Sequence, residues 1–135
     1  MVVILDEPFA SVAFDEKLLL VIVTWKDAPM TFENYKAAFT AALDFQVNNT
    51  VINYMSDIRK QKIVSPQFRK WFQEVAVPRA VKQGLKRGAV VFSGNVFKKY
   101  YLNNILNTTK RFGLPFKFFN SEEKAFKWLD TQMKQ

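Results

Sequence analysis

The segment Leu18–Trp25 constrains the fold most, because its first six residues are all apolar and only Thr24 interrupts the run before Trp25. The run is far shorter than the roughly 20 residues that cross a bilayer, so it does not predict a membrane span. It is typical of a strand that is buried on both faces. Just before it, Ala10, Val12 and Phe14 alternate with polar or small residues. Together these segments predict a hairpin whose second strand lies inside the molecule.

After the hairpin, helical and strand patterns alternate along the chain. Thr31 is a residue type that caps helices, and apolar residues follow it at helical spacing as far as about Asn48. Alternation of this kind requires crossover connections, which place successive strands parallel to one another. The sequence therefore predicts one α/β domain over residues 1–135, with a small, mostly parallel sheet, an N-terminal antiparallel hairpin and about four helices. The pattern predicts the further strands over residues 50–55, 89–93 and 116–119 and the further helices over about 65–86, 95–111 and 121–133.

The helix predicted to begin near residue 65 contains an irregularity. Its apolar residues form two stripes, one ending at Val75 and one beginning at Val77, and the two stripes are out of phase. Pro78 lies at the change of phase. Proline inside a helix removes a backbone hydrogen bond and clashes with the preceding turn, so we expect a kink or a short interruption there.

The composition excludes several classes of chemistry. The chain has no cysteine and no histidine, which excludes disulfides, thiolate zinc sites, cysteine nucleophiles and every triad that uses imidazole. None of the four glycines lies in a dinucleotide fingerprint or a phosphate-binding loop. A hydrolase using Asp57 would need a second carboxylate or a metal beside it, and no spacing in the sequence supplies either. We therefore predict a non-enzymatic protein with no cofactor and no metal.

The charge distribution is asymmetric. Residues 1–67 hold six basic and eight acidic side chains, whereas residues 68–135 hold fourteen basic and four acidic ones. Fifteen of the twenty basic residues are lysines, and no known nucleic-acid motif accompanies them. Arg79, Lys82 and Lys86 recur at helical spacing, as expected of a solvated helix face. We expect a protein partner, possible self-association as a homodimer, and no specific recognition of nucleic acid.

The N-terminal residues lack the pattern of a secretory signal, so we expect none. Its apolar residues meet Asp6 and Glu7 at once, no basic residue precedes them, and no small-residue cleavage site follows. The cytoplasm is the expected location.

Polar residues follow several predicted strands and form the best candidate site. Ser56, Asp57 and Arg59 stand at the end of one strand, and Ser93 and Asn95 follow the next. In open parallel sheets, ligands bind outside the carboxyl ends of the strands, so we expect a binding or regulatory region there. The alternative is that these residues are helix caps and turn residues, with Asp57 and Arg59 paired locally to order the loop.

Two helix N-termini carry further candidate residues. Ser65 followed by Pro66 has the types and order of an N-cap and a first-turn proline. A serine in this position is also one at which free backbone N–H groups would accommodate a phosphate, so we include Ser65 in the candidate site. Glu122 and Glu123 follow the predicted cap Ser121, where their charge complements the helix dipole, and we assign them no further role.

The order of several short segments resembles a known family. They are Ser56-Asp57-Ile58-Arg59 at the end of a strand, Val64-Ser65-Pro66, Val77-Pro78-Arg79-Ala80, Gly84-Leu85-Lys86, and Phe119-Asn120-Ser121-Glu122-Glu123 with Ala125, Trp128 and Leu129. In this order and spacing, over about residues 10–130, the chain resembles small uncharacterised bacterial proteins of the STAS-like group. That group is related in fold to the sporulation anti-sigma-factor antagonists and to the C-terminal domains of sulfate transporters.

The resemblance implies a fold and a mode of action. The implied fold is a right-handed βα superhelix whose helices cover one side of the sheet. The implied action is regulatory docking to other proteins or sensing of a small ligand. In phosphoregulated members the acceptor serine lies in an Asp-Ser-Ser-Gly stretch that begins the helix after the strand ending here at Asp57. Ser65 is the nearest match by position, but this chain lacks the second serine and the glycine and has Pro66 instead.

Two functions follow as expectations. The first is a cytoplasmic regulatory or protein-interaction module of the STAS-like type, with the rim around Asp57 as its contact region. The alternative is a binding module for a small amphipathic or anionic ligand, suggested by the basic second half and the many aromatic residues.

Overall fold

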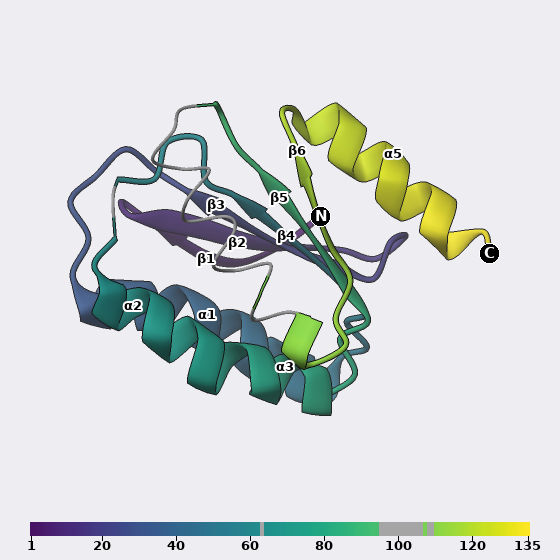
Figure 1. The fold of residues 1–135 in the computed structure, drawn as a ribbon, viewed down its shortest axis with the longest axis horizontal. Coiled ribbons are helices and arrows are strands. Elements are labelled where there is room, and N and C mark those ends of the chain that lie inside the picture. The colour runs from purple at the N-terminus through teal and green to yellow at the C-terminus, as the bar shows by residue number, and fades with distance from the viewer. Residues whose placement is uncertain (63, 95–106, 108–109) are drawn as a thin grey trace.

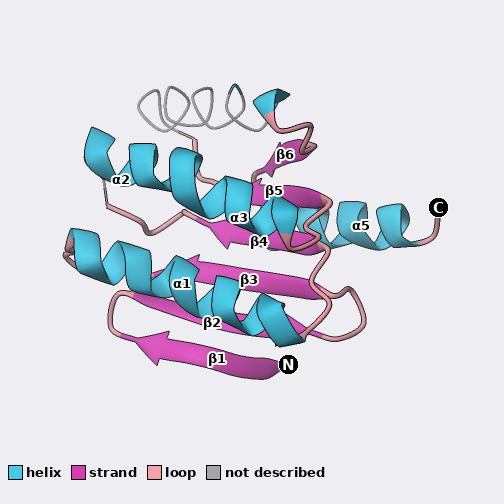
Figure 2. Cartoon of the chain, turned by 90° about the horizontal axis from the view of Figure 1, so that it is seen from below, coloured by secondary structure: helices cyan, strands magenta, loops and turns pink. Residues whose placement is uncertain are grey.

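The structure is a computed structural model that describes residues 1–62, 64–94, 107 and 110–135. Its centre is a six-stranded sheet in which the strands lie side by side in the order of the sequence. The first three strands are antiparallel, and the third to the sixth are parallel (Figures 1 and 2). The strands are β1 (Val2–Glu7), β2 (Ala10–Asp15), β3 (Leu20–Trp25), β4 (Asn53–Asp57), β5 (Arg87–Val91) and β6 (Phe116–Phe119).

The predicted hairpin and the doubly buried strand are confirmed. In β3, Val21, Val23 and Trp25 belong to the core on one face of the sheet, whereas Leu20 and Ile22 belong to a second core on the other. β6 has the predicted bounds, and β4 and β5 are each displaced by about two residues from the predicted ranges. β1 is an additional strand that the sequence analysis did not identify.

The crossover helices in the described part of the chain cover one face of the sheet. Helix α1 (Phe32–Asn48) begins after Thr31, whose hydroxyl accepts a hydrogen bond of 3.0 Å from the backbone N–H of Asn34. The segments α2 (Pro66–Trp71) and α3 (Val77–Lys82) lie beside α1 on the same face (Figure 2). Consecutive crossovers of one hand between neighbouring strands must lie on one side, which accounts for this layer.

Helix α5 (Glu122–Met133) lies on the opposite face of the sheet (Figure 1). Ala125 and Leu129 of α5 are fully buried against Leu20, Met55 and other residues of that face. The resemblance to the STAS-like group implies helices on one side of the sheet, and the position of α5 on the other side differs from that expectation. The physical reason is that α5 follows the last strand and is not a crossover, so the handedness rule does not assign it a face. The apolar face of the sheet opposite α1 provides the surface that α5 covers.

The expected interruption near Pro78 is present as a π-helical turn. Residues Phe72–Ala76 form the segment η1 between α2 and α3, and the N–H of Val77 donates to the carbonyl of Phe72. One extra residue in a helical turn shifts the following stripe around the axis, which explains the change of phase. Phe72 and Ala76 are both buried, so each part of the interrupted helix still presents apolar residues to the core.

The structure tests two further predictions only over the residues that it describes. The helix predicted over about residues 95–111 falls mostly on residues 95–106, 108 and 109, which lie outside the described residues. In the described part of the chain, no helix has the length and apolar character needed to cross a bilayer.

Gly88 is required by the close approach of β6. A Cβ atom added at Gly88 would lie 2.5 Å from two ring carbons of Phe116, its neighbour in register on β6. We predict that Gly88→Ala lowers the free energy of unfolding by about 1–3 kcal/mol, the usual cost of overpacking a core. Gly94→Ala is the matched control, because a Cβ there meets nothing within 4 Å. Urea denaturation measures both, and equal midpoints for the two variants would contradict the prediction.

Candidate functional site

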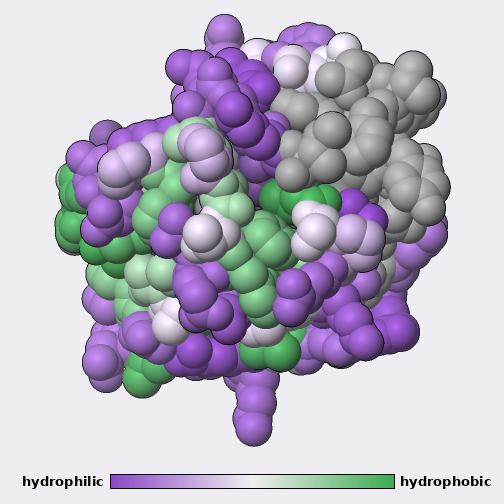
Figure 3. Space-filling model, turned by 90° about the vertical axis from the view of Figure 1, so that its left-hand side faces the viewer, coloured by the Kyte–Doolittle hydropathy of each residue, from purple (hydrophilic) through white to green (hydrophobic). Residues whose placement is uncertain are grey.

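An open cleft lies where β3 and β4 end and α5 begins. Its volume is about 760 Å³. The end of the molecule at which the parallel strands finish presents hydrophilic side chains next to apolar surface (Figure 3). Three basic and three acidic residues contribute to the walls, so neither sign of charge dominates. The cleft is lined by Thr24, Trp25, Lys26, Asp27, Asp57, Arg59, Lys60 and Glu122.

Asp57 and Arg59 form the centre of the cleft. Asp57 is the last residue of β4, in register with Thr24 of β3 and Val91 of β5, and its side chain is 7% exposed. Arg59 donates from Nε to Oδ1 at 3.0 Å and from Nη2 to Oδ2 at 2.7 Å, and its backbone N–H also donates to Oδ1 at 3.1 Å. A bidentate pair of this kind is strong and fixes the planes of both groups. The local pairing considered as an alternative in the sequence analysis is therefore present.

Glu122 supplies a second carboxylate beside Asp57, so the expectation that Asp57 has no carboxylate neighbour is wrong. It is the first residue of α5, after Ser121, whose hydroxyl accepts from the backbone N–H of Lys124 at 3.3 Å. Its Oε1 lies 3.6 Å from Nη2 of Arg59, so the guanidinium faces both Asp57 and Glu122. From the sequence Ser121-Glu122-Glu123 alone, the only role that could be predicted for Glu122 was to complement the helix dipole. The packing of α5 on the face of β4 that carries Asp57 brings the two carboxylates together.

The environment separates the pKa values of the two carboxyl groups. Burial on its own would raise the pKa of Asp57, but the hydrogen bonds and the charge of Arg59 outweigh it and lower that pKa overall. Burial raises the pKa of Glu122, and the hydrogen bond with Asp57 and the charge of Asp57 raise it further. Asp57 is thus an ionised carboxylate with both oxygens occupied, and such a group is a weak base. Asp57 is therefore suited to ordering the loop and to holding the charged groups of the cleft in fixed positions.

Ser56 is separated from the cleft. It alternates with Asp57 along β4, so it faces the helices α1–α3, where it lies in register with Val23 and Val90. It is buried, and the indole Nε1 of Trp25 donates to its hydroxyl at 3.3 Å. Its role in the structure is to satisfy a buried indole, and the prediction that it shares a contact region with Asp57 is wrong.

The other predicted site residues do not gather around Asp57 either. Ser65 is exposed at the N-cap position of α2, and Pro66 lies in the first turn, as predicted, but the side chain of Ser65 makes no capping hydrogen bond. Its carbonyl accepts from the N–H groups of Phe68 and Arg69 instead. Ser93 is exposed two residues after β5 and does not line the cleft. Asn95 lies outside the described residues.

The described residues contain no group of three or more carboxylate, histidine or cysteine side chains placed to hold a metal ion. Comparison of the chain with protein-family models, with curated proteins and with solved structures finds no match. The site is therefore defined by its own geometry: a neutralised, partly buried Asp57–Arg59 pair, a second carboxylate and a cleft of balanced charge.

We predict that Asp57→Asn lowers the free energy of unfolding by about 1–3 kcal/mol near pH 7, the range for hydrogen bonds to charged groups. Because the folded-state pKa of Asp57 is lowered, the stabilisation by Asp57 is complete above the ordinary pKa of an aspartate. It is lost as the pH falls through the lowered pKa. Denaturation of both proteins between pH 7 and pH 2 measures this, and Glu122→Gln, at a more exposed position, should change stability little. A gap between wild type and Asp57→Asn that stays constant with pH would contradict the assignment.

The two predicted N-caps should respond differently to alanine. The hydroxyl of Thr31 makes a capping hydrogen bond and that of Ser65 makes none. We expect Thr31→Ala to lower the free energy of unfolding by about 1 kcal/mol. We expect Ser65→Ala to change it by less than about 0.5 kcal/mol, as at an ordinary surface position. Thermal denaturation of the two variants side by side decides, and equal losses would show that Ser65 caps α2 in solution.

Proposed function

We propose that this chain is a non-enzymatic regulatory or protein-interaction module of the STAS-like type, acting in the cytoplasm. Its partner is a protein, for which a second copy of the chain is one alternative, and the contact region is the cleft around Asp57 and Arg59. The observation that carries the proposal is the Asp57–Arg59 pair, which fixes a charged rim and occupies both oxygens of Asp57. The resemblance of the sequence and the one-sided layer of crossover helices support the same type of fold.

The balanced charge of the cleft favours a protein surface over a simple anion. Lys26, Arg59 and Lys60 are balanced by Asp27, Asp57 and Glu122. Protein interfaces combine apolar surface with a rim of both charge signs, and complementary charges there set orientation and rate of association. Lys60 is exposed in this cleft, so it is available to a partner.

The proposal is tested with a charge reversal at the rim. The full chain is used for affinity capture, captured proteins are identified and purified, and each dissociation constant is measured by calorimetry. Lys60→Glu should weaken the binding of the true partner by about tenfold, because reversal sets like charges against each other. Lys17→Glu, in the exposed turn between β2 and β3 at the other end of the strands, is the matched control and should leave binding unchanged.

Sedimentation of the purified chain over a range of concentrations tests the homodimer. If the chain associates, Lys60→Glu should weaken the association in the same way. Binding that is equally sensitive to both reversals, or insensitive to both, would place the contact elsewhere and overturn the proposal.

A further inference from the structure

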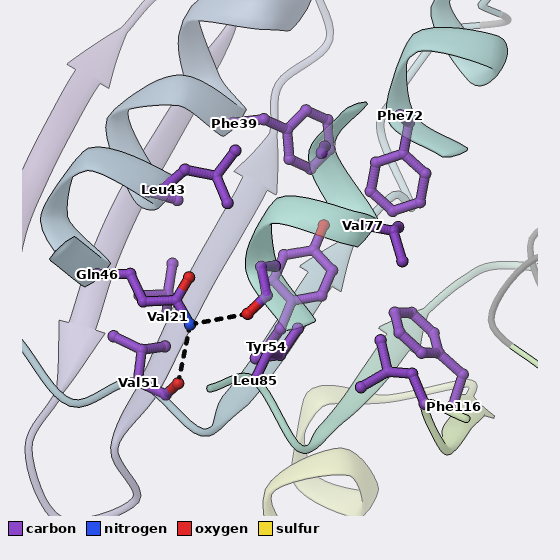
Figure 4. A pocket seen from close by; sticks show the side chains of 14 residues that line it. Val21, Phe39, Leu43, Gln46, Val51, Tyr54, Phe72, Val77, Leu85 and Phe116 are labelled. Atoms are coloured by element: carbon purple, nitrogen blue, oxygen red, sulfur yellow. Dashed lines mark hydrogen bonds between the residues drawn. The ribbon is translucent and has the colours of Figure 1, made fainter. Parts of the chain in front are cut away.

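A second candidate site lies on the helix-covered face of the sheet, away from the cleft. An apolar cavity of about 50 Å³ separates the second half of α1 and α3 from the strands (Figure 4). Val21 and Tyr54 of the sheet point toward it, and Leu43 and Val77 face them from the helices. The cleft at Asp57 shares no residue with this cavity.

Small side chains leave the cavity open. Ala42 on α1 and Ala76 and Ala80 on the interrupted helix line it where larger residues would fill the space. Ala42, Ala80 and Leu85 are only half-buried, so the cavity approaches the surface between α1 and the end of α3. An unfilled apolar space weakens packing, and an apolar group that entered it would regain those contacts.

The side-chain amide of Gln46, on the wall of the cavity, is already hydrogen-bonded. Nε2 of Gln46 donates to the carbonyls of Val51 at 3.1 Å and Ala80 at 3.3 Å (Figure 4). Its Oε1 accepts from Nε2 of Gln83 at 3.0 Å. Buried water needs two to four polar partners, and the amide group of Gln46 is already engaged with Val51, Ala80 and Gln83. The mostly apolar cavity therefore suits an alkyl group better than water.

The cationic side chain of Arg79 is linked to the wall of the cavity through Gln83, which donates to Gln46. Nε of Arg79 donates to Oε1 of Gln83 at 3.2 Å, and its Nη2 contacts Oδ1 of Asp44 at 2.9 Å. The side chains of Arg79 and Asp44 are 37% and 64% exposed, so an anion from solvent can compete for the guanidinium. Lys82 and Lys86 are exposed nearby in sequence. Arg79 and Lys86, interpreted from the sequence as part of a solvated helix face, thus adjoin in sequence the lining residues Ala80 and Leu85.

We propose that this cavity binds the alkyl chain of a small anionic amphiphile, a short alkyl carboxylate, whose head group pairs with Arg79. The binding is independent of the docking proposed at Asp57. The small volume admits the end of a chain of a few carbons and not a bulky ring system.

Titration of the isotope-labelled full chain by NMR tests the proposal. Octanoate should give saturable shifts at cavity residues such as Leu43 and Val77, whereas acetate, which lacks the chain, should give none. Octylammonium, with the same chain and the opposite charge, should bind at least about threefold more weakly, the size of an exposed ion-pair effect. Absence of saturable shifts with octanoate, or equal affinity for octylammonium, would overturn the proposal.

Substitutions at two alanines of α1 locate the site. Ala42→Leu should fill the cavity and weaken octanoate binding at least about tenfold, and the exposed Ala37→Leu on the same helix should leave it unchanged. If Ala42→Leu fails to fold, Val77→Ala decides, because it enlarges the cavity and should bind octanoate at least as tightly as the wild type. Equal binding by Ala42→Leu and Ala37→Leu, or weaker binding by Val77→Ala, would place octanoate elsewhere.

Discussion

The burial of β3 on both faces is the constraint on which the rest of the structure depends. Val21 and Val23 need apolar cover on one side, and Leu20 and Ile22 need it on the other. The crossover helices can cover only one of these faces, since their handedness places them together. A helix outside the crossovers must cover the second face, and α5 does so with Ala125 and Leu129. The position of Glu122, and with it the composition of the cleft, follows from that requirement.

Much of the fold could be predicted because its signals are local. The run Leu18–Trp25, the cap at Thr31 and the period of α1 each lie within one stretch of sequence, and the structure has these elements as predicted. β1 was missed because its pairing with β2 leaves Val2 and Val3 exposed, so it lacks the alternation of a half-buried strand. The face covered by α5 was missed because it is set by the area left open by the other helices, a property of the assembled sheet.

Part of the candidate site could likewise be predicted from local sequence, and part of it could not. Asp57 and Arg59 are two residues apart, and their pairing could be anticipated as a turn interaction. The pairing of Arg59 with Glu122 could not, because the two segments meet only through the packing of α5 on β4. Ser56 could not be separated from Asp57 without knowing which face of β4 each side chain takes. Once β4 is placed between β3 and β5, the alternation of a strand assigns them to opposite faces.

The cleft and the cavity are joined by β4, which carries Asp57 at its end and Tyr54 within it. Tyr54 faces the helices and Asp57 faces α5, so a ligand at one would have to move the strand to affect the other. β4 is paired over Asn53–Asp57 with β3 on one side and β5 on the other, and both neighbours are themselves buried. A shift of β4 would break two ladders at once, and closely packed cores resist such continuous deformation. Occupation of the cavity should therefore leave the Asp57–Arg59 pair in place, and we expect the two proposed sites to be independent of each other.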